Sequence, residues 1–281
     1  MKNNIFIPIL SALLLLVTGS CSDISEDERF IVIDSVAPQR AVLLEDFTGQ
    51  DCPNCPSAHV VIDGLVSQYG NAVIPVAIHA GSMAISCTAR RPGLMQPEGN
   101  TYNDRYGIDE WPKGIVNGNS GRLNPDEWSD AVRSAVQLPA SLGIELTATV
   151  GEISDDNPGV ISVDCKLRPS ADIQGVLSVW VLEDGIVARQ RDIDRGLISD
   201  YVHNHVYRAA VNGVEGENVT LQANVHKDLT YTIPVRVTEK ETWNVANLSI
   251  VAFVRQADGG VAQAARCKVL QTGSDDAAPE K

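Results

Sequence analysis

The segment LLEDFTGQDCPNC, residues 43–55, joins a short apolar run to two cysteines three residues apart. The run from Ala41 to Thr48 predicts a short buried strand. After Cys55, apolar residues recur at the spacing of one helix face, and Gly70 is a suitable helix end. The residues on that face are Ala58, Val61, Ile62, Leu65 and Tyr69. This segment therefore predicts a buried strand that is followed, through a CxxC pair, by an amphipathic helix.

Two cysteines in the first turn of a helix can form a short-range disulfide. The partial positive charge at the helix N-terminus favours the thiolate of Cys52, which makes it the better nucleophile and the better leaving group. Cys55 lies deeper in the helix and is expected to resolve a mixed disulfide. Pro53 suits a helix start and stiffens the turn.

Strand-like and helix-like segments alternate as far as residue 137. Residues 73–78 predict a second strand, and residues 80–105 a polar connection with some helix near Tyr102. Residues 114–118 predict a brief strand closed by an Asn-Gly turn. Asn124 and Pro125 then form an N-cap and first position of a further helix. This alternation predicts an α/β domain.

After Pro139 the pattern changes to short segments of alternating apolar and polar residues, separated by turns. This change predicts an antiparallel sandwich. The strand-like segments are residues 144–150, 161–167, 177–181, 230–233 and 248–254. The predicted division is a signal peptide (1–20), a lipidated cysteine with an acidic linker (21–39), an α/β domain (40–138), a β-sandwich (139–271) and a disordered tail (272–281).

The α/β part resembles the thioredoxin superfamily. Residues 44–55 are similar to its strand-loop-CxxC segment, and residues 106–118 to its cis-proline segment. The resemblance implies that Asp46 is the buried acid that assists proton transfer. It also implies that Pro112 is the cis-proline that guides an extended substrate chain, with Trp111 and Pro53 beside the substrate. The predicted fold class is thus an α/β thioredoxin-like domain followed by an all-β, immunoglobulin-like antiparallel sandwich.

The N-terminal residues predict export and lipidation. One lysine precedes an apolar run too short to span a bilayer, which is typical of a signal peptide. The run ends in Thr18-Gly19-Ser20-Cys21, which resembles the bacterial lipobox and implies lipidation of Cys21. The whole layout resembles a Bacteroidetes family of outer-membrane lipoproteins, the twenty-eight-kilodalton outer-membrane protein family. We therefore expect an outer-membrane lipoprotein, facing the periplasm or the cell surface and held to the membrane by its lipid.

Charge and residue spacing exclude several function classes. With 36 acidic and 22 basic residues the net charge is −14, which disfavours nucleic acid as a partner. No metal site is predicted, because no four ligands stand at the spacing of a closed zinc site. His59 is interpreted as a helix-surface residue. His203 and His205 would face the same side if they lay on one strand, but no Asp, Glu or Cys at matching spacing completes a metal site. Cys165 and Cys267 either form a disulfide or pack as small apolar groups.

The leading hypothesis is thiol–disulfide exchange on other envelope proteins, with Cys52, Cys55, Asp46 and Pro112 as catalytic residues. This chemistry uses the disulfide itself and needs no organic cofactor. The alternative hypothesis is a surface-exposed binding or adhesion lipoprotein whose disulfide is redox-inactive. A buried Asp46 favours the first hypothesis, and an exposed one fits the second. The sequence predicts neither the substrate nor the oligomeric state.

Overall fold

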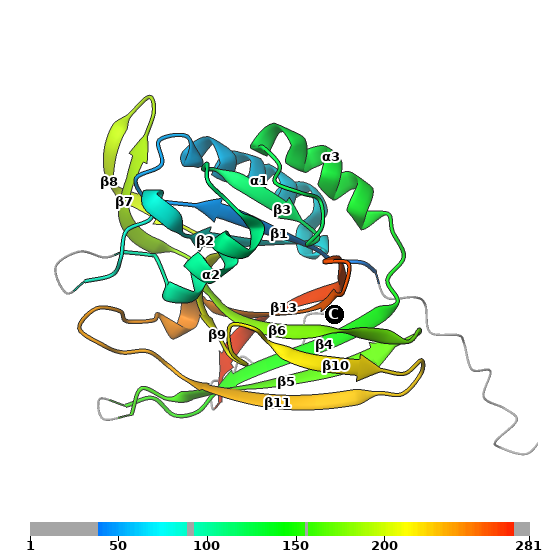
Figure 1. The fold of residues 1–281 in the computed structure, drawn as a ribbon. Helices are drawn as coiled ribbons and strands as arrows, with labels where there is room; N and C mark the ends of the chain where they lie inside the picture. Colours follow the sequence, from blue (N-terminus) through cyan, green and yellow to red (C-terminus); the bar gives the residue numbers. More distant parts are fainter. Residues whose placement is uncertain (1–38, 89–92, 155–156, 273–281) are drawn as a thin grey trace, which may run out of the picture. The chain divides into compact units, whose positions relative to one another are not determined.

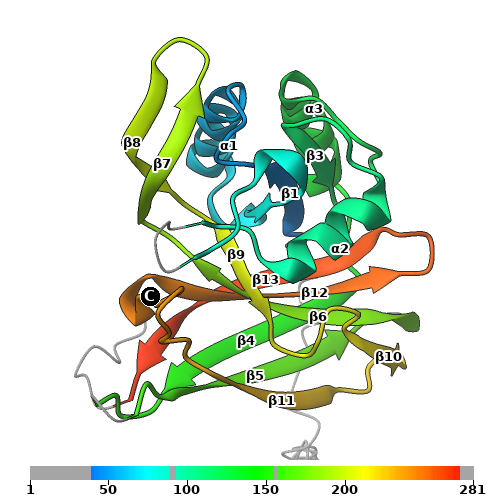
Figure 2. The same ribbon diagram turned by 60° about the vertical axis from the view of Figure 1, so that its left-hand side comes forward.

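A computed structural model describes residues 39–88, 93–154 and 157–272 (Figures 1 and 2). The predicted signal peptide, Cys21 and the acidic leader lie outside these residues, as does the chain after residue 272. The helices are α1 (Cys55–Tyr69), α2 (Pro97–Tyr106) and α3 (Pro125–Val136), with short 3-10 turns η2 (Gly70–Ala72), η3 (Gly81–Met83) and η4 (Val245–Asn247). The strands are β1 (Val42–Thr48), β2 (Val73–His79), β3 (Lys113–Val116), β4 (Leu142–Val150), β5 (Val160–Pro169), β6 (Ile173–Glu183), β7 (Ile186–Asp192), β8 (Gly196–His203), β9 (Val206–Ala210), β10 (Glu217–Leu221), β11 (Lys227–Pro234), β12 (Leu248–Gln256) and β13 (Val261–Gln271).

Most of these strands belong to one mixed sheet. Ten of them follow the order β11-β5-β4-β13-β12-β6-β9-β2-β1-β3, and β10 pairs with β6 beside this path. β7 and β8 form a separate antiparallel hairpin, residues 186–203, which is called the hairpin below. Figure 2 shows the hairpin next to α1, away from the strands at the other end of the sheet.

Both faces of β1 are covered, and all seven of its residues are buried. Val42 and Leu44 contribute to a core that they share with α1 and α3. Leu43 and Phe47 contribute to a second core, which includes Trp180 and other side chains of β6, β9 and β12. The period-2 alternation of a strand sends these two sets to opposite faces.

Backbone and side-chain contacts join the N-terminal strands to the C-terminal ones. β2 pairs in parallel with β9 at Ala77 and Val206, and the Ala77 amide donates a hydrogen bond to the carbonyl of His205 (2.8 Å). On β1, the buried carboxylate of Glu45 forms an ion pair with Arg255 of β12 (3.1 Å). The two parts of the chain are therefore continuous in hydrogen bonding and in packing.

β13 connects two regions of the sheet. Its first part pairs antiparallel with β12, and residues 269–271 pair in parallel with β4. A third core collects side chains from β4, β5, β6 and β12, among them Leu167, Val179 and Ile250. This arrangement closes the C-terminal strands around one apolar interior.

These connections show that the predicted fold class is wrong. The described residues are 48% strand and 20% helix, with one 11-stranded mixed sheet instead of a thioredoxin-like α/β domain followed by a separate sandwich. Alternation along a strand indicates which faces are buried, but not which element covers them. Here strands β6, β9 and β12 help cover the face of β1 and β2 that an independent α/β domain covers with helices.

Several local predictions are confirmed. α3 begins at Pro125 with Asn124 as its N-cap. The predicted second strand corresponds to β2, and helix α2 lies in the stretch expected to be a polar connection with some helix near Tyr102. Local capping and periodicity were thus sufficient to predict these elements, although they did not predict how the elements assemble.

Candidate functional site

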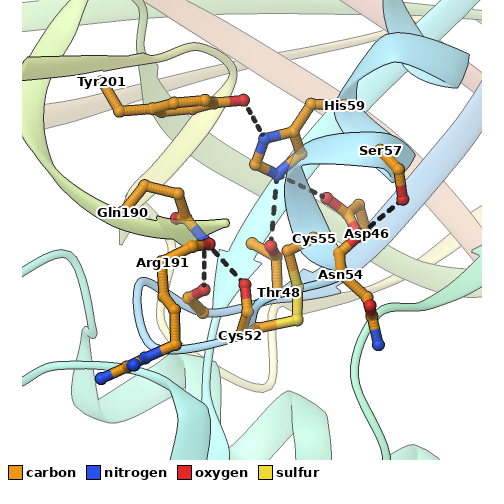
Figure 3. The surroundings of a disulfide bond; sticks show 11 residues. Asp46, Thr48, Cys52, Asn54, Cys55, Ser57, His59, Gln190, Arg191 and Tyr201 are labelled. Carbon is orange, nitrogen blue, oxygen red and sulfur yellow. Dashed lines mark hydrogen bonds and ion pairs between the residues drawn. A yellow bond between two sulfur atoms is a disulfide. The ribbon is translucent and has the colours of Figure 1, made fainter. Parts of the chain in front are cut away.

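The candidate site lies where β1 passes into α1. Cys52 and Cys55 form the predicted disulfide, and their Cα atoms are 5.5 Å apart. The preceding loop is tight, because the amide of Asp51 donates to the carbonyl of Met83 (2.9 Å). A Cβ added to Gly49 would lie 2.3 Å from the same carbonyl oxygen, so only glycine fits there. Residues 49–55 are called the disulfide loop below, and Figure 3 shows their surroundings.

The disulfide is enclosed by protein. Cys52 is 1% exposed and Cys55 is 0% exposed. Pro53, between them, is partly exposed. A partner thiol therefore has no open path to either sulfur in this conformation, since exchange requires direct attack on a sulfur atom.

Asp46 is fully buried near the disulfide loop (Figure 3). Its carboxyl oxygens have no hydrogen-bond partner among the residues that the structure describes, and Nε2 of His59 lies 3.7 Å from Oδ2. Burial raises the pKa of Asp46 to about 8, and burial lowers the pKa of His59 to about 3, with smaller effects from two other histidines. Both groups are thus uncharged at neutral pH, and their proximity is not a salt bridge.

Side chains of the hairpin cover the disulfide loop. The Gln190 amide donates hydrogen bonds to the carbonyls of Cys52 (2.9 Å) and Gly49 (3.2 Å), and its side chain is completely buried. Arg189 forms an ion pair with Asp51. The hairpin thereby supplies a donor to the Cys52 carbonyl and a second donor to the Gly49 carbonyl, which also accepts from the Cys52 amide (3.1 Å).

The hairpin backbone also bonds to the loop. The amide of Arg191 donates to the carbonyl of Gln50 (2.8 Å), and the amide of Ile193 donates to the carbonyl of Pro53 (2.9 Å). The two carbonyls that accept these bonds belong to residues on either side of Cys52. The hairpin therefore acts as a cover that is fastened by both its backbone and its side chains.

A second set of contacts lies on the side of the hairpin that faces α1 and β2. Nδ1 of His59 is 2.7 Å from the hydroxyl of Tyr201, and the rings of His79 and His203 meet edge to face with centroids 5.4 Å apart. These three histidines are called the histidine cluster below. They line a cavity of about 50 Å³ together with Tyr201. His59 is therefore a contact residue of the hairpin, where the sequence suggested only a helix surface.

His203 and His205 do not lie on one strand, so the condition for a shared side is not met. His203 ends β8 and is buried, whereas His205 follows in a turn with φ of 57°. Nδ1 of His205 lies 3.2 Å from Asp184 and 3.1 Å from Arg266. β8 ends at His203, so the alternation of side chains along a strand does not extend to His205.

The predicted proline segment lies at the same end of β1 as the disulfide. The peptide bond between Trp111 and Pro112 is cis, and β3 begins at the next residue, Lys113, which pairs with Phe47. Trp111 is partly buried with its ring against Gly81, where an added Cβ would lie 2.0 Å from the ring. The roles of Cys52, Cys55, Asp46, Pro112, Trp111 and Pro53 in catalysis or substrate binding stay predictions.

Sequence reasoning missed the hairpin residues Gln190 and Tyr201. They contact the Cys52 carbonyl and His59, which lie more than 130 positions earlier in the chain. No motif marks them, because a glutamine or a tyrosine in a strand is common. Only the structure shows that Gln190 and Asp192 lie on the buried side of β7. A strand that packs on a core is usually apolar at such positions, so these two polar residues point to a polar neighbour.

Three further cysteines of the described residues, Cys87, Cys165 and Cys267, are free thiols. Burial raises the pKa of Cys165 and of Cys267 to about 12. Among residues 39–88, 93–154 and 157–272, no three His, Cys, Asp or Glu side chains are grouped to hold a metal ion. In the same residues, no helix has the length and apolar character needed to cross a membrane.

Comparison with solved structures shows a shared fold. The HBP35 protein of Porphyromonas gingivalis matches with a TM-score of 0.64 at 15% sequence identity, over 86% of this chain and 80% of that one. A domain of the outer membrane lipoprotein Omp28 from the same organism matches at 26% identity with a TM-score of 0.34, over 47% of this chain and 90% of that one. No curated protein sequence matches the chain. Membership in the thioredoxin superfamily is not shown, and that resemblance stays a prediction.

A family model described as outer membrane protein Omp28 matches residues 99–272. It confirms the predicted outer-membrane lipoprotein. The family model matches well over half of this chain, and the chain therefore belongs to the Omp28 family of outer membrane proteins.

Proposed function

We propose that this lipoprotein is a binding protein and that the outward face of the hairpin contacts its partner. Val187 and Val202 are directly opposite each other on β7 and β8, and they are 60% and 52% exposed. Nearer the turn, Leu197 and Ile193 are also exposed apolar side chains, and Leu197 pairs with the exposed Arg191. Contiguous exposed apolar side chains mark interaction sites on soluble surfaces. This apolar face is the observation that carries the proposal.

The burial of the disulfide supports the same function. A redox-active cysteine is typically a low-pKa, accessible thiol, and Cys52 is only 1% exposed. In this proposal the disulfide holds the loop on which the hairpin packs. It thus presents the apolar face in one fixed position.

Site-specific photo-crosslinking in intact cells tests the binding function. A photoreactive amino acid replaces Val187 in one strain and Val160, an exposed valine of β5, in a control strain. We expect one discrete adduct of higher mass from position 187 and none from position 160. Equal crosslinking at both positions, or none at either, would overturn the proposal.

A second candidate function is thiol–disulfide exchange on envelope proteins, and the burial of Asp46 favours it. A carboxyl with a pKa of about 8 holds a proton at neutral pH. When a client thiolate attacks Sγ of Cys52, the bond to Cys55 breaks and Cys55 leaves as a thiolate. Asp46 can donate its proton to that thiolate, and the reaction uses no organic cofactor.

A redox titration separates the two candidates. The full lipoprotein is equilibrated in detergent with glutathione buffers, alkylated and analysed by mass spectrometry. Reversible exchange of the pair between roughly −270 and −120 mV supports the enzyme. If the pair stays oxidised below roughly −300 mV, the disulfide is structural, and the binding function is the candidate that remains.

A further inference from the structure

The hairpin is joined to the sheet by a narrow neck. It leaves β6 after Glu183 and returns to β9 at Val206. The neck is closed by two hydrogen bonds, from the His205 amide to Asp184 (2.6 Å) and from the Gly185 amide to Asn204 (2.9 Å). Gly185 and His205 both have positive φ. Beyond this neck the hairpin is held by the disulfide loop on one side and by the histidine cluster on the other.

The histidine cluster holds the hairpin with uncharged rings. His79 and His203 are 3% and 2% exposed, and in the described part of the chain no group forms a full hydrogen bond with their ring nitrogens. The nearby backbone of Ala77 raises the pKa of His79, and that of Ala188 and Arg189 raises the pKa of His203, but burial has the larger effect on both pKa values. His203 also contacts the ring of Tyr201, with centroids 4.8 Å apart. A neutral imidazole fits this enclosed site, whereas an imidazolium buried without an anion is strongly unfavourable.

We propose that the hairpin is a pH-sensitive latch: protonation of the histidine cluster releases it from α1 and β2 and opens the path to the Cys52–Cys55 disulfide. The latch controls access to the sulfurs and rests on neither of the functions proposed above. Burial lowers the pKa of His203 to about 4 and of His59 to about 3, and that of His79 well below its usual range. With the hairpin closed, the three imidazoles therefore stay neutral at a pH at which they would be protonated if the hairpin were open.

The charged and titratable groups that face the cluster do not supply a compensating anion. Asp46 of β1 is itself protonated under acidic conditions, because its pKa is raised. Asp63 of α1 is exposed at the edge of the cavity. His205 and Arg208 of the neighbouring β9 region oppose protonation of the cluster. Tyr201 of β8 is neutral, since its pKa is raised to about 12.

The expected effect follows from proton linkage. In the open state each imidazole regains an ordinary pKa of about 6.5. Between about pH 7.5 and about pH 5, each released histidine therefore raises the open fraction about 30-fold. Release of His79 and His203 together raises it about 1000-fold.

The rate of disulfide reduction measures the open fraction. The full lipoprotein in detergent is treated with a phosphine reductant, quenched with acid and analysed by mass spectrometry for the 52–55 pair. Each rate is divided by that of oxidised glutathione at the same pH, which removes the pH dependence of the reagent. We expect the normalised rate to rise at least 30-fold from about pH 7.5 to about pH 5. A flat ratio would overturn the latch.

Variants assign the effect to the cluster. H203Q, which cannot take up a proton, is expected to lose about 30-fold of the acceleration, and H226Q, at an exposed histidine, to behave as the wild type. An unchanged acceleration in H203Q would contradict the proposal. Hydrogen exchange on the wild type covers the case in which H203Q fails to fold. At about pH 5 the amides of Arg191 and Ile193 should lose protection while those of β12 keep it, and uniform loss would show global unfolding in place of a latch.

Discussion

Asp46 and Glu45 are neighbours on β1, and both are buried, but their carboxyl groups have opposite surroundings. Glu45 faces Arg255 (3.1 Å) and accepts a hydrogen bond from Tyr106 (3.1 Å). Asp46 has no cationic partner in the described part of the chain, and burial raises its pKa to about 8. At pH 7 the unfolded chain ionises Asp46 and the folded one does not, so this residue favours unfolding.

We therefore predict that Asp46→Asn stabilises the protein. An amide has nearly the shape of the protonated carboxyl and removes the cost of keeping it neutral. The free energy of unfolding at pH 7, measured by urea denaturation, should rise on the order of 4 kcal/mol. Glu45→Gln is the matched control, and it should lower that free energy by about 3 kcal/mol because Arg255 loses its partner. A destabilised Asp46→Asn variant would contradict the buried, proton-bearing carboxyl.

At this scale the sequence revealed one half of the candidate site. Cys52 and Cys55 were recognised because spacing and position in a helix mark them, and Asp46 because a motif includes it. Gln190 and Tyr201 carry no such mark, since their role depends on where the hairpin packs. Residues that act through tertiary contact alone leave no local pattern.

The hairpin is the element that departs most from what its sequence suggests. Its inward residues Gln190 and Asp192 are polar because they face the disulfide loop and the hairpin's own turn instead of an apolar core. Its outward residues Val187 and Val202 are apolar. Arg191 is exposed and Ala188 is buried, so both sides of β7 mix polar and apolar residues and alternation alone does not identify the buried face.

Gln190→Ala tests how strongly this element is fastened. The change removes the hydrogen bond from Gln190 to the Cys52 carbonyl, and a buried unsatisfied carbonyl costs about 1 to 3 kcal/mol. The Gly49 carbonyl keeps its hydrogen bond from the Cys52 amide (3.1 Å). We expect an unfolding free energy lower by that amount and faster reduction of the disulfide at neutral pH. Gln174→Ala, at an exposed position of β6, should change neither quantity. Equal effects of the two variants would show that the hairpin is not held by Gln190.

Across the whole molecule, the contacts between distant strands decide the architecture. Residues 41–48 were correctly interpreted as a buried strand, and nothing in them indicates that Trp180 and Phe253 fill one of its faces. The pairing of Ala77 with Val206 is likewise a contact between residues far apart in the chain. Sequence periodicity predicts individual helices and strands. Which side chains pack against each face of a strand depends on how the complete chain folds.

The buried titratable groups also determine how stability depends on pH. The histidine cluster has lowered pKa values, so below about pH 6.5 the unfolded chain binds protons that the folded one excludes, and stability falls as pH falls toward 4. Asp46 has a raised pKa, so it causes stability to fall as pH rises from about 4 to about 8. Each group contributes roughly 1 kcal/mol per pH unit within its range.

Three imidazoles outweigh one carboxyl on the acidic side, and the carboxyl acts alone between about pH 6.5 and 8. We therefore predict a maximum in the free energy of unfolding near pH 6.5, with a steeper acidic limb than alkaline limb, in urea denaturation at a series of pH values. Asp46→Asn should flatten the alkaline limb and leave the acidic limb at least as steep, whereas H203Q should make the acidic limb shallower. A curve that rises steadily to pH 8 would mean that Asp46 is ionised in the folded protein, and with it the proton that exchange at Cys55 requires would be absent.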